Sequence, residues 1–230
     1  MIQEMQAIAH IRSDFPQKFG IPRQSGIVPE TTARIIFEPE FRQEEAFRGL
    51  EGFSRLWLIW VFSANRHAAW QPTVRPPRLG GNTRMGVFAT RSPYRPNPIG
   101  LSCVELDHLE HTAEGPVLVV RGADLMDGTP ILDIKPYLPY ADAFPDAAIG
   151  FTKDTHRPRL VIDFPEKLLK VIPEEKRAAL NGILGEDPRP SYQEDGRAYG
   201  VSFAGKNIRF YVEGNVLHVT AVEELEALEK

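Results

Sequence analysis

Short runs of β-forming residues, separated by glycine and proline, dominate the first 150 residues. We expect strands at 5–12, 33–37, 54–62, 85–90, 99–109, 116–121 and 129–134. Only the stretch from Pro39 to Leu50 has apolar residues at helical spacing, which predicts one short helix. The run SRLWLIWVF at 54–62 is too apolar for an edge strand, so we expect both of its faces to be covered. The pair Asp127-Gly128 predicts a turn before the last strand. Seven short strands with one helix predict a closed or nearly closed sheet.

The pattern changes after about residue 150. We expect a strand at 160–164, a helical stretch at 166–184 that Pro173 interrupts, and strands at 198–203, 208–212 and 216–222. Turns are expected at Gly205-Lys206 and at 213–215. The predicted fold class is therefore mainly β: a small single-sheet β-barrel domain over 1–150, followed by a small α+β C-terminal domain over 151–230.

Composition excludes several classes of protein. The 230 residues are 42% hydrophobic, which is enough for a core and argues against global disorder. The single cysteine, Cys103, excludes an internal disulfide and any cysteine-rich metal centre, and favours a reducing, intracellular compartment. In its strand, Cys103 is expected to be a buried, inert thiol rather than a nucleophile.

Neither a membrane span nor a metal site is expected. The longest apolar run, Leu56 to Phe62, is about a third of the length that a spanning helix needs. The N-terminus has no apolar signal-peptide region, so we expect a cytoplasmic protein. His108 and His111 are the one close histidine pair, and a strand end exposed to solvent explains them better than a metal site does.

Charge is distributed very unevenly along the chain. The net charge is −4, yet residues 52–104 contain no acidic residue and no lysine. The arginines of this window are Arg55, Arg66, Arg75, Arg78, Arg84, Arg91 and Arg95. The window therefore carries +7 and the remainder −11. Guanidinium groups bind phosphate or carboxylate bidentately, so the window is a candidate anion-binding surface. Arginines that pair with acids elsewhere in the chain are the alternative.

The same window is stiff and rich in glycine. It contains six prolines, each of which fixes φ and removes a backbone donor. Gly80, Gly81 and Gly86 allow close backbone approach to a ligand. The Pro-Asn-Pro turn at 96–98 is expected to direct Arg95 and Asn97. No dinucleotide-binding or P-loop motif is present. The residues alone thus indicate an anionic, nucleotide-like ligand.

These residues resemble a known family. The segment QPTVRPPRLGGNTRMGVFATRSPYRPNPIG, from Gln71 to Gly100, is similar to the signature of the TsaA/TrmO family of S-adenosylmethionine-dependent tRNA methyltransferases. Further segments that resemble the family are IRSDFPQKFGIPRQSG (11–26), RGLEGFSRLWLIWVF (48–62), DLMDGTPILDIKPYLPYAD (124–142) and DPRPSY (187–192). The resemblance covers nearly the whole chain.

The resemblance implies a fold, a cofactor and a substrate. It implies a β-barrel methyltransferase that forms a homodimer, with S-adenosylmethionine bound near the subunit interface. It implies that the substrate is tRNA, methylated on the exocyclic nitrogen of threonylcarbamoyladenosine, the modified base just 3′ of the anticodon.

Cofactor-site residues follow from the family's motifs. The resemblance implies that Pro22, Arg23, Gln24, Ser63, Ala64, Arg91, Asp124, Leu125, Met126 and Asp127 bind the cofactor. Bacterial members commonly have histidine at the position of Ser63, so the chain departs from the family there.

The chemistry of the cofactor agrees with this set. Its carboxylate needs a cation such as Arg23 or Arg91, and its ammonium and hydroxyl groups need an acceptor such as Asp124 or Asp127. Ordinary turn residues are the alternative for the two acids. The catalytic candidates are Asp127 and Asp133, either of which would accept the proton of the methylated nitrogen unless water does so, and Tyr137. With Tyr140, Tyr137 either stacks on a base or closes the barrel.

The tRNA contacts are expected in the arginine-rich window. The candidates are Arg75, Arg78, Arg84, Arg95 and Asn97. Arg189 and Arg197 either help to hold the anticodon arm or buttress the barrel. Two other functions stay open: a non-catalytic tRNA- or nucleotide-binding barrel, which the departure at Ser63 favours, and a methyltransferase for another substrate.

Overall fold

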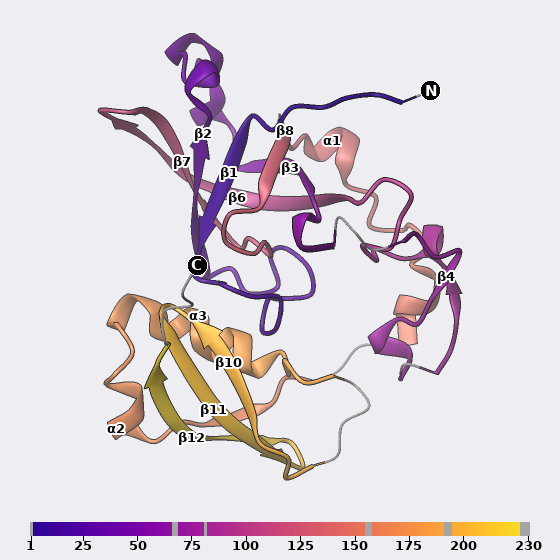
Figure 1. Cartoon of the computed structure of the whole chain (residues 1–230), viewed down its shortest axis with the longest axis vertical. Helices are drawn as coiled ribbons and strands as arrows, with labels where there is room; N and C mark the ends of the chain where they lie inside the picture. The colour runs from indigo at the N-terminus through magenta and orange to yellow at the C-terminus, as the bar shows by residue number, and fades with distance from the viewer. Residues whose placement is uncertain (1, 66–68, 81, 155–157, 191–194, 226–230) are drawn as a thin grey trace.

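Six antiparallel strands close into a barrel in the N-terminal part of the chain (Figure 1). The computed structural model describes residues 2–65, 69–80, 82–154, 158–190 and 195–225, without the side chains of Arg78 and Asp154. The barrel strands are β1 (Ala9–Ser13), β2 (Thr32–Phe37), β3 (Arg55–Val61), β6 (Ile99–Thr112), β7 (Gly115–Arg121) and β8 (Pro130–Pro136). Their order around the barrel is β1-β2-β7-β6-β3-β8. The predicted closed sheet is confirmed.

Strand β3 lies inside the sheet, between β6 and β8. Its inward residues Leu56, Leu58 and Trp60 are buried with the barrel core, as period-two alternation requires. The expectation that both faces are covered was wrong, because on the outward face Arg55 is exposed and the other residues are only partly buried. One of them, Trp57, donates from Nε1 to Asp142 of the short helix α1 (Pro139–Asp142) at 2.9 Å.

The predicted helix at 39–50 was also wrong. This stretch forms three separate 3₁₀ turns, η1 (Pro39–Phe41), η2 (Glu44–Phe47) and η3 (Leu50–Gly52). Phe47 is buried against the barrel, where its ring packs edge-on against Phe37 at 4.8 Å. Gly49 adopts φ of 87°, which interrupts any continuous helix. The apolar spacing therefore reflects anchoring on the barrel.

The arginine-rich window contains little regular structure. The strand expected at 85–90 is reduced to β5 (Met85–Gly86), which pairs with β4 (Thr73–Val74), and the chain continues as η6 (Val87–Ala89). Two further 3₁₀ turns are η4 (Ser63–Asn65) and η5 (Pro77–Leu79). In Figure 1 the part that carries β4 projects away from the barrel strands.

The C-terminal part is a separate small α+β unit, as expected. Its sheet has the order β10 (Tyr199–Phe203), β11 (Lys206–Glu213), β12 (Val216–Glu224), β9 (Val161–Asp163), with β9 parallel to β12. The helices are α2 (Glu166–Leu169) and α3 (Glu174–Gly185), and η7 (Gly150–Asp154) precedes them. Pro173 is the N-cap residue of α3, which confirms the predicted interruption.

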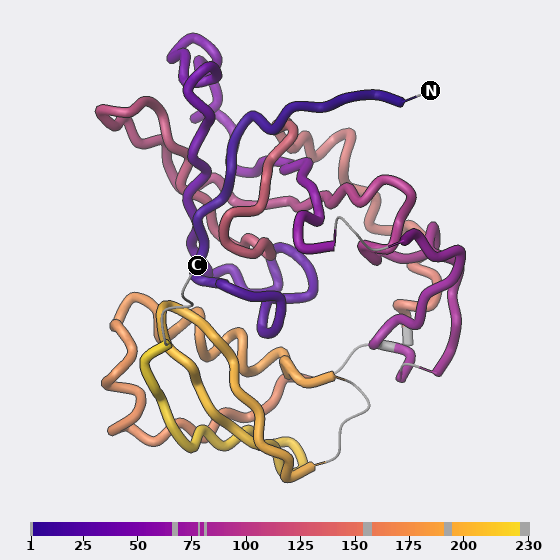
Figure 2. Tube along the Cα trace, in the orientation of Figure 1, coloured from indigo at the N-terminus to yellow at the C-terminus, as the bar shows by residue number. Residues whose placement is uncertain are grey.

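The segment between β1 and β2 belongs to both parts (Figure 2). Phe15 and Val28 are buried in the C-terminal core, and the Phe15 ring lies 5.4 Å from that of Phe203. On its other side the segment bonds the barrel, since the Gly26 amide donates to the Gly122 carbonyl at 2.8 Å. A chain division at residue 150 therefore stays a prediction. In the described residues, no helix is long and apolar enough to cross a membrane.

Candidate functional site

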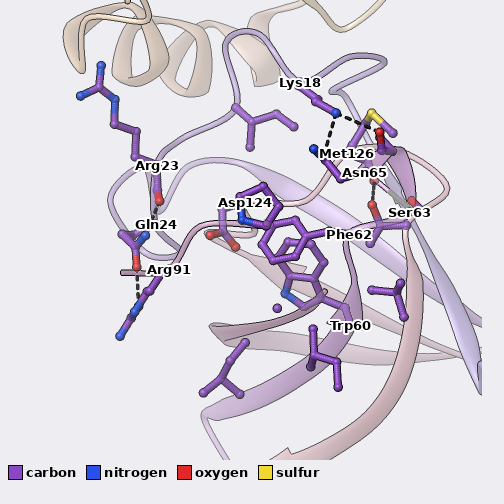
Figure 3. Close-up of a pocket in the computed structure, with 18 of the residues that line it drawn as sticks. Lys18, Arg23, Gln24, Trp60, Phe62, Ser63, Asn65, Arg91, Asp124 and Met126 are labelled. Atoms are coloured by element: carbon purple, nitrogen blue, oxygen red, sulfur yellow. Dashed lines mark hydrogen bonds between the residues drawn. The ribbon is translucent and has the colours of Figure 1, made fainter. Parts of the chain in front are cut away.

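A pocket of about 460 Å³ lies at one end of the barrel (Figure 3). Its walls come from the β1–β2 segment, the end of β3 with the turn η4, residues 90–95, the start of β6, and the β7–β8 connection. The antiparallel register pairs Val61 with Ile99, so the end of β3 and the start of β6 meet at this place. The barrel topology thus brings together segments that range from Lys18 to Thr129 in the sequence.

Most of the sequence-derived cofactor candidates line this pocket. They are Pro22, Arg23, Gln24, Ser63, Ala64, Arg91, Asp124 and Met126. Leu125 does not line it, because its side chain is buried in the barrel core. Asp127 does not line it either. Its carboxylate accepts from the Ser13 amide at 3.0 Å and from Arg12 at 3.3 Å. The alternative of an ordinary turn residue accounts for Asp127, where the predicted turn at Gly128 is present with φ of 75°.

A buried chain of hydrogen bonds leads to the pocket. Trp60 Nε1 donates to Ser102 Oγ at 2.9 Å, and Ser102 Oγ donates to Asp124 Oδ1 at 2.5 Å. Burial raises the pKa of the Asp124 carboxyl above its usual value. The hydrogen bond from Ser102, backbone amides and the charge of Arg91 oppose that rise. Asp124 is therefore a desolvated carboxyl held in place at the pocket wall.

The two expected cations have different surroundings. Arg91 is exposed at the pocket and donates from Nη1 to Gln24 Oε1. Arg23 donates from Nη2 to the carbonyls of Asp187 and Arg189, at 3.4 and 3.2 Å. Figure 3 shows the Arg23 side chain pointing away from Asp124. Of the pair, Arg91 is therefore the better placed to meet an anion in the pocket.

Several pocket residues were missed by the sequence reasoning. Lys18 Nζ donates to the Ala64 carbonyl at 3.0 Å and to Asn65 Oδ1 at 2.6 Å, which ties the β1–β2 segment to η4. Trp60 and Phe62 form an aromatic wall, with ring centroids 4.3 Å apart. Ser102 bonds Asp124 without lining the pocket itself. It could have been found, because period-two alternation in β6 makes it a polar residue on the inward face of an apolar barrel.

Nearly the whole chain is similar to proteins of one known family. Residues 10–143 match the model of the tRNA-methyltransferase O N-terminal domain, and residues 159–225 match that of the TrmO C-terminal domain. The chain belongs to the TrmO family. It is 41% identical to the tRNA (adenine(37)-N6)-methyltransferase of Escherichia coli K12, over 96% of this chain and 97% of the relative.

Two further similarities support this assignment. A putative S-adenosylmethionine-dependent methyltransferase of Pseudomonas aeruginosa is 42% identical, with 87% of this chain and 89% of the relative covered. The crystal structure of TrmO from Pseudomonas aeruginosa superposes with a TM-score of 0.77 at 34% identity, covering 96% of this chain and 99% of that one. The family expected from the sequence motifs is confirmed.

None of the three catalytic candidates lies at the pocket of this TrmO-family barrel. Asp127 is bonded elsewhere, as described above. Asp133 accepts from the Ile134 amide at 2.9 Å and pairs with Lys135 at 2.8 Å. Tyr137 packs on Trp57, with ring centroids 5.8 Å apart. Tyr140 is 85% exposed, so it does not close the barrel.

The arginine-rich residues 69–80 and 82–98, called the arginine lobe below, are mostly exposed. Arg75 and Asn97 are exposed, and Arg84 donates from Nη1 to Thr73 Oγ1 at 2.9 Å. Arg95 instead braces the lobe: its Nη1 donates to the carbonyls of Thr90 and Val87, at 2.7 and 3.1 Å. The side chain of Arg78 lies outside the described part.

Pairing with acids does not explain the lobe. Arg55, on β3, lies 3.6 Å from Glu105. Within the described residues, Arg75, Arg84, Arg91 and Arg95 form no ion pair. The described residues therefore do not support the alternative that these arginines neutralise acids of the same chain. Arg66 lies outside the described residues.

The remaining candidates have local structural contacts. His108 pairs with Asp107 at 2.8 Å and His111 with Glu44 at 3.1 Å, and the described residues contain no group of three potential metal ligands. Cys103 is only partly buried, whereas a buried thiol was expected. Partial burial still raises the pKa of the Cys103 thiol.

The C-terminal arginine Arg189 is a structural residue. Its side chain is 11% exposed, and it is held by Asp187 at 2.8 Å and by Asp195 at 3.2 Å. The carbonyl of this same residue accepts from Arg23 at the pocket wall. These contacts favour the buttress among the two roles expected for Arg189.

Proposed function

We propose that this chain is an S-adenosylmethionine-dependent methyltransferase that methylates the exocyclic nitrogen of threonylcarbamoyladenosine, next to the anticodon of tRNA. The observation that carries the proposal is the pocket at the barrel end, where a carboxylate, a guanidinium and an aromatic wall converge. The relative from Escherichia coli, similar over nearly the whole chain, is a tRNA (adenine(37)-N6)-methyltransferase.

The residues of the pocket fit the cofactor. Its volume of about 460 Å³ is in the range of small-molecule sites. Trp60 and Phe62 offer an apolar face for the adenine, Asp124 an acceptor for an N–H or O–H group, and Arg91 a cation for the carboxylate. When bound, S-adenosylmethionine supplies a methyl group already activated by its sulfonium.

The task of the protein is then mainly alignment. Orientation of two reactants contributes up to about 7–11 kcal/mol in favourable systems. The rigid strand ends of β3 and β6 fix one side of the pocket, and the Lys18 contacts to Ala64 and Asn65 fix the adjoining turn. Because Asp127, Asp133 and Tyr137 do not line the pocket, we propose that water accepts the proton of the methylated nitrogen.

The arginine lobe is the proposed surface for tRNA. Arg75, Arg84 and Asn97 are exposed on it, and Arg91 joins it to the pocket. Neutralising phosphates releases counterions, so tRNA binding should weaken steeply with salt.

We further propose a homodimer in the cytoplasm. Large apolar side chains are exposed at Trp70, Phe88 (73%), Tyr140 and Phe144, which favours a second copy of the chain as a cover. Sedimentation equilibrium tests this part: a monomer at micromolar concentration contradicts the homodimer.

The reaction itself is tested on purified tRNA. Threonine tRNA that carries threonylcarbamoyladenosine is incubated with the protein and S-adenosylmethionine, and its nucleosides are analysed by mass spectrometry. We expect one added methyl group on the modified nucleoside, and none with the Arg91→Ala variant or with tRNA that lacks the threonylcarbamoyl group. No heat with S-adenosylmethionine in calorimetry, together with binding of tRNA, would instead support the non-catalytic alternative.

A further inference from the structure

Ser102 is a polar residue in an apolar place. Its side chain is 1% exposed, on the inward face of β6, and its neighbours along that face are Gly100 and Val104. The barrel core around it is made of aliphatic and aromatic side chains. A buried hydroxyl costs stability unless it is hydrogen-bonded, so a serine here needs a hydrogen-bond partner.

The direction of the hydrogen bonds at Ser102 is fixed. An indole nitrogen can only donate, so Ser102 Oγ accepts from Trp60 Nε1. The hydroxyl proton is then left to donate, and it points to Asp124 Oδ1 at 2.5 Å. This distance is typical of a hydroxyl that donates to an ionised carboxylate.

Trp60, the donor in this series of hydrogen bonds, is packed tightly. A Cβ atom on Gly100 would lie 2.3 Å from the Trp60 indole, so the ring occupies the space that any other residue at 100 would need. The Phe62 ring packs on Trp60 at 4.3 Å. The acceptor end, Asp124, reaches the pocket beside these two rings (Figure 3). The two buried hydrogen bonds therefore hold the Asp124 carboxylate in a fixed position relative to the barrel strands.

We propose that Ser102 is a positioning residue of the cofactor site. By donating to Oδ1, it keeps the Asp124 carboxylate ionised and oriented, so that the remaining acceptor positions of the carboxylate take an N–H or O–H group of S-adenosylmethionine. An ionised carboxylate has about four lone-pair sites, which leaves room for such a donor. The inference rests on the proposed function.

Four influences set the pKa of Asp124. They are its burial, the Ser102 hydroxyl, the backbone amides of Asp124 and Ser25, and the charge of Arg91. Burial raises the pKa and the other three lower it. Loss of the Ser102 hydroxyl therefore raises it further. Because the carboxylate form is lost as pH falls, cofactor affinity should begin to fall at a higher pH in a Ser102→Ala variant than in the unchanged protein.

The experiment measures S-adenosylmethionine dissociation constants by calorimetry, from mildly acidic to mildly basic buffer. For Ser102→Ala we expect a Kd raised about tenfold, as for loss of one hydrogen bond to a charged group, with the pH midpoint displaced upward. Affinity for tRNA should stay unchanged. In an Asp124→Asn background, Ser102→Ala should have little further effect on Kd, because Ser102 acts through the carboxylate.

Ser202→Ala is the matched control. Ser202 is also buried, at 6% exposure, and accepts from Gln17 Nε2 at 2.9 Å, but it does not line the pocket. This variant removes the same hydroxyl from the C-terminal sheet and should leave Kd and its pH midpoint unchanged. If Ser102→Ala fails to fold, Ser102→Cys, which keeps the shape with a weaker donor, should raise Kd by a smaller factor.

Three outcomes overturn the inference while the proposed function stands. The first is that Ser102→Ala binds S-adenosylmethionine with unchanged Kd and pH midpoint. The second is that its effect adds fully to that of Asp124→Asn. The third is that Ser202→Ala raises Kd equally. If the unchanged protein does not bind S-adenosylmethionine at all, the proposed function itself fails.

Discussion

The pocket and the arginine lobe share residues 90–95, yet the other parts of the two regions are built in opposite ways. The pocket is formed in part by the ends of β3 and β6, whose register the barrel fixes. Its carboxylate, Asp124, is held by a buried series of hydrogen bonds. The lobe has only the two-residue strands β4 and β5, and Arg75 and Asn97 on it are exposed. This contrast suits a small cofactor that needs exact alignment and a large polyanion that needs many weak charge contacts.

The largest effect is expected at Asp124. Replacing it by asparagine keeps the size of the side chain and removes the charge, so we expect the Kd for S-adenosylmethionine to rise about tenfold to a hundredfold. In the unchanged protein, affinity should fall as pH drops through the raised pKa of Asp124. Calorimetry over a pH series measures both effects, and an unchanged pH profile in Asp124→Asn contradicts the assignment.

A comparison of two glycines tests the rigidity of the two regions. In Gly100→Ala the new Cβ would lie 2.3 Å from the Trp60 indole, so we expect a loss of about 1–3 kcal/mol in the free energy of unfolding. Gly86 lies in the arginine lobe, and a Cβ there meets no heavy atom within 4 Å. Gly86→Ala should leave the denaturation midpoint nearly unchanged. Equal destabilisation in both variants would contradict the difference in packing between the two regions.

Substitution of two exposed arginines tests whether the lobe binds tRNA. Changing Arg75 and Arg84 together to glutamine should weaken tRNA binding several-fold, and should reduce the slope of log affinity against log salt by about 0.7–0.9 for each phosphate that is no longer neutralised. Filter binding over a salt series measures this slope. The Kd for S-adenosylmethionine should not change. A parallel loss of cofactor affinity would mean that lobe and pocket do not divide the two tasks.

The smallest effect is expected at Asp127, three residues from Asp124. Its carboxylate bonds the Ser13 amide and the exposed Arg12, so Asp127→Asn should cost at most about 1 kcal/mol of stability. Cofactor affinity should be unchanged, which calorimetry checks beside a thermal melt. A loss of affinity for S-adenosylmethionine equal to that of Asp124→Asn would mean that Asp127 contributes to the cofactor site.

The elements that the sequence predicted correctly are those governed by local rules. Alternating apolar residues defined the barrel strands, and Pro173 marked the start of α3. The error at 39–50 has a tertiary cause. The aromatic residues there are spaced for contact with the barrel rim, and Gly49 breaks the stretch into 3₁₀ turns.

In the site, most of the cofactor candidates drawn from the motifs line the pocket, but the motifs could not rank them. Asp124 and Asp127 belong to one motif, and only the course of the chain after β7 sends one carboxyl to the pocket and the other to Ser13. Arg23 and Arg91 were equivalent candidates for the cation. The contact of Arg23 with the Asp187 and Arg189 carbonyls, on the C-terminal unit, distinguishes them.

The sequence by itself determined the two-part organisation, the acid-free arginine window and the family, because periodicity, charge and motifs can be read from neighbouring residues. The tertiary structure decided which polar groups act together. Trp60, Ser102 and Asp124 come from three separate segments: the register of β3 against β6 places Trp60 beside Ser102, and the connection between β7 and β8 brings Asp124 to them. Hydrogen bonds between residues so far apart depend on the packing of the whole barrel, and no local pattern encodes them.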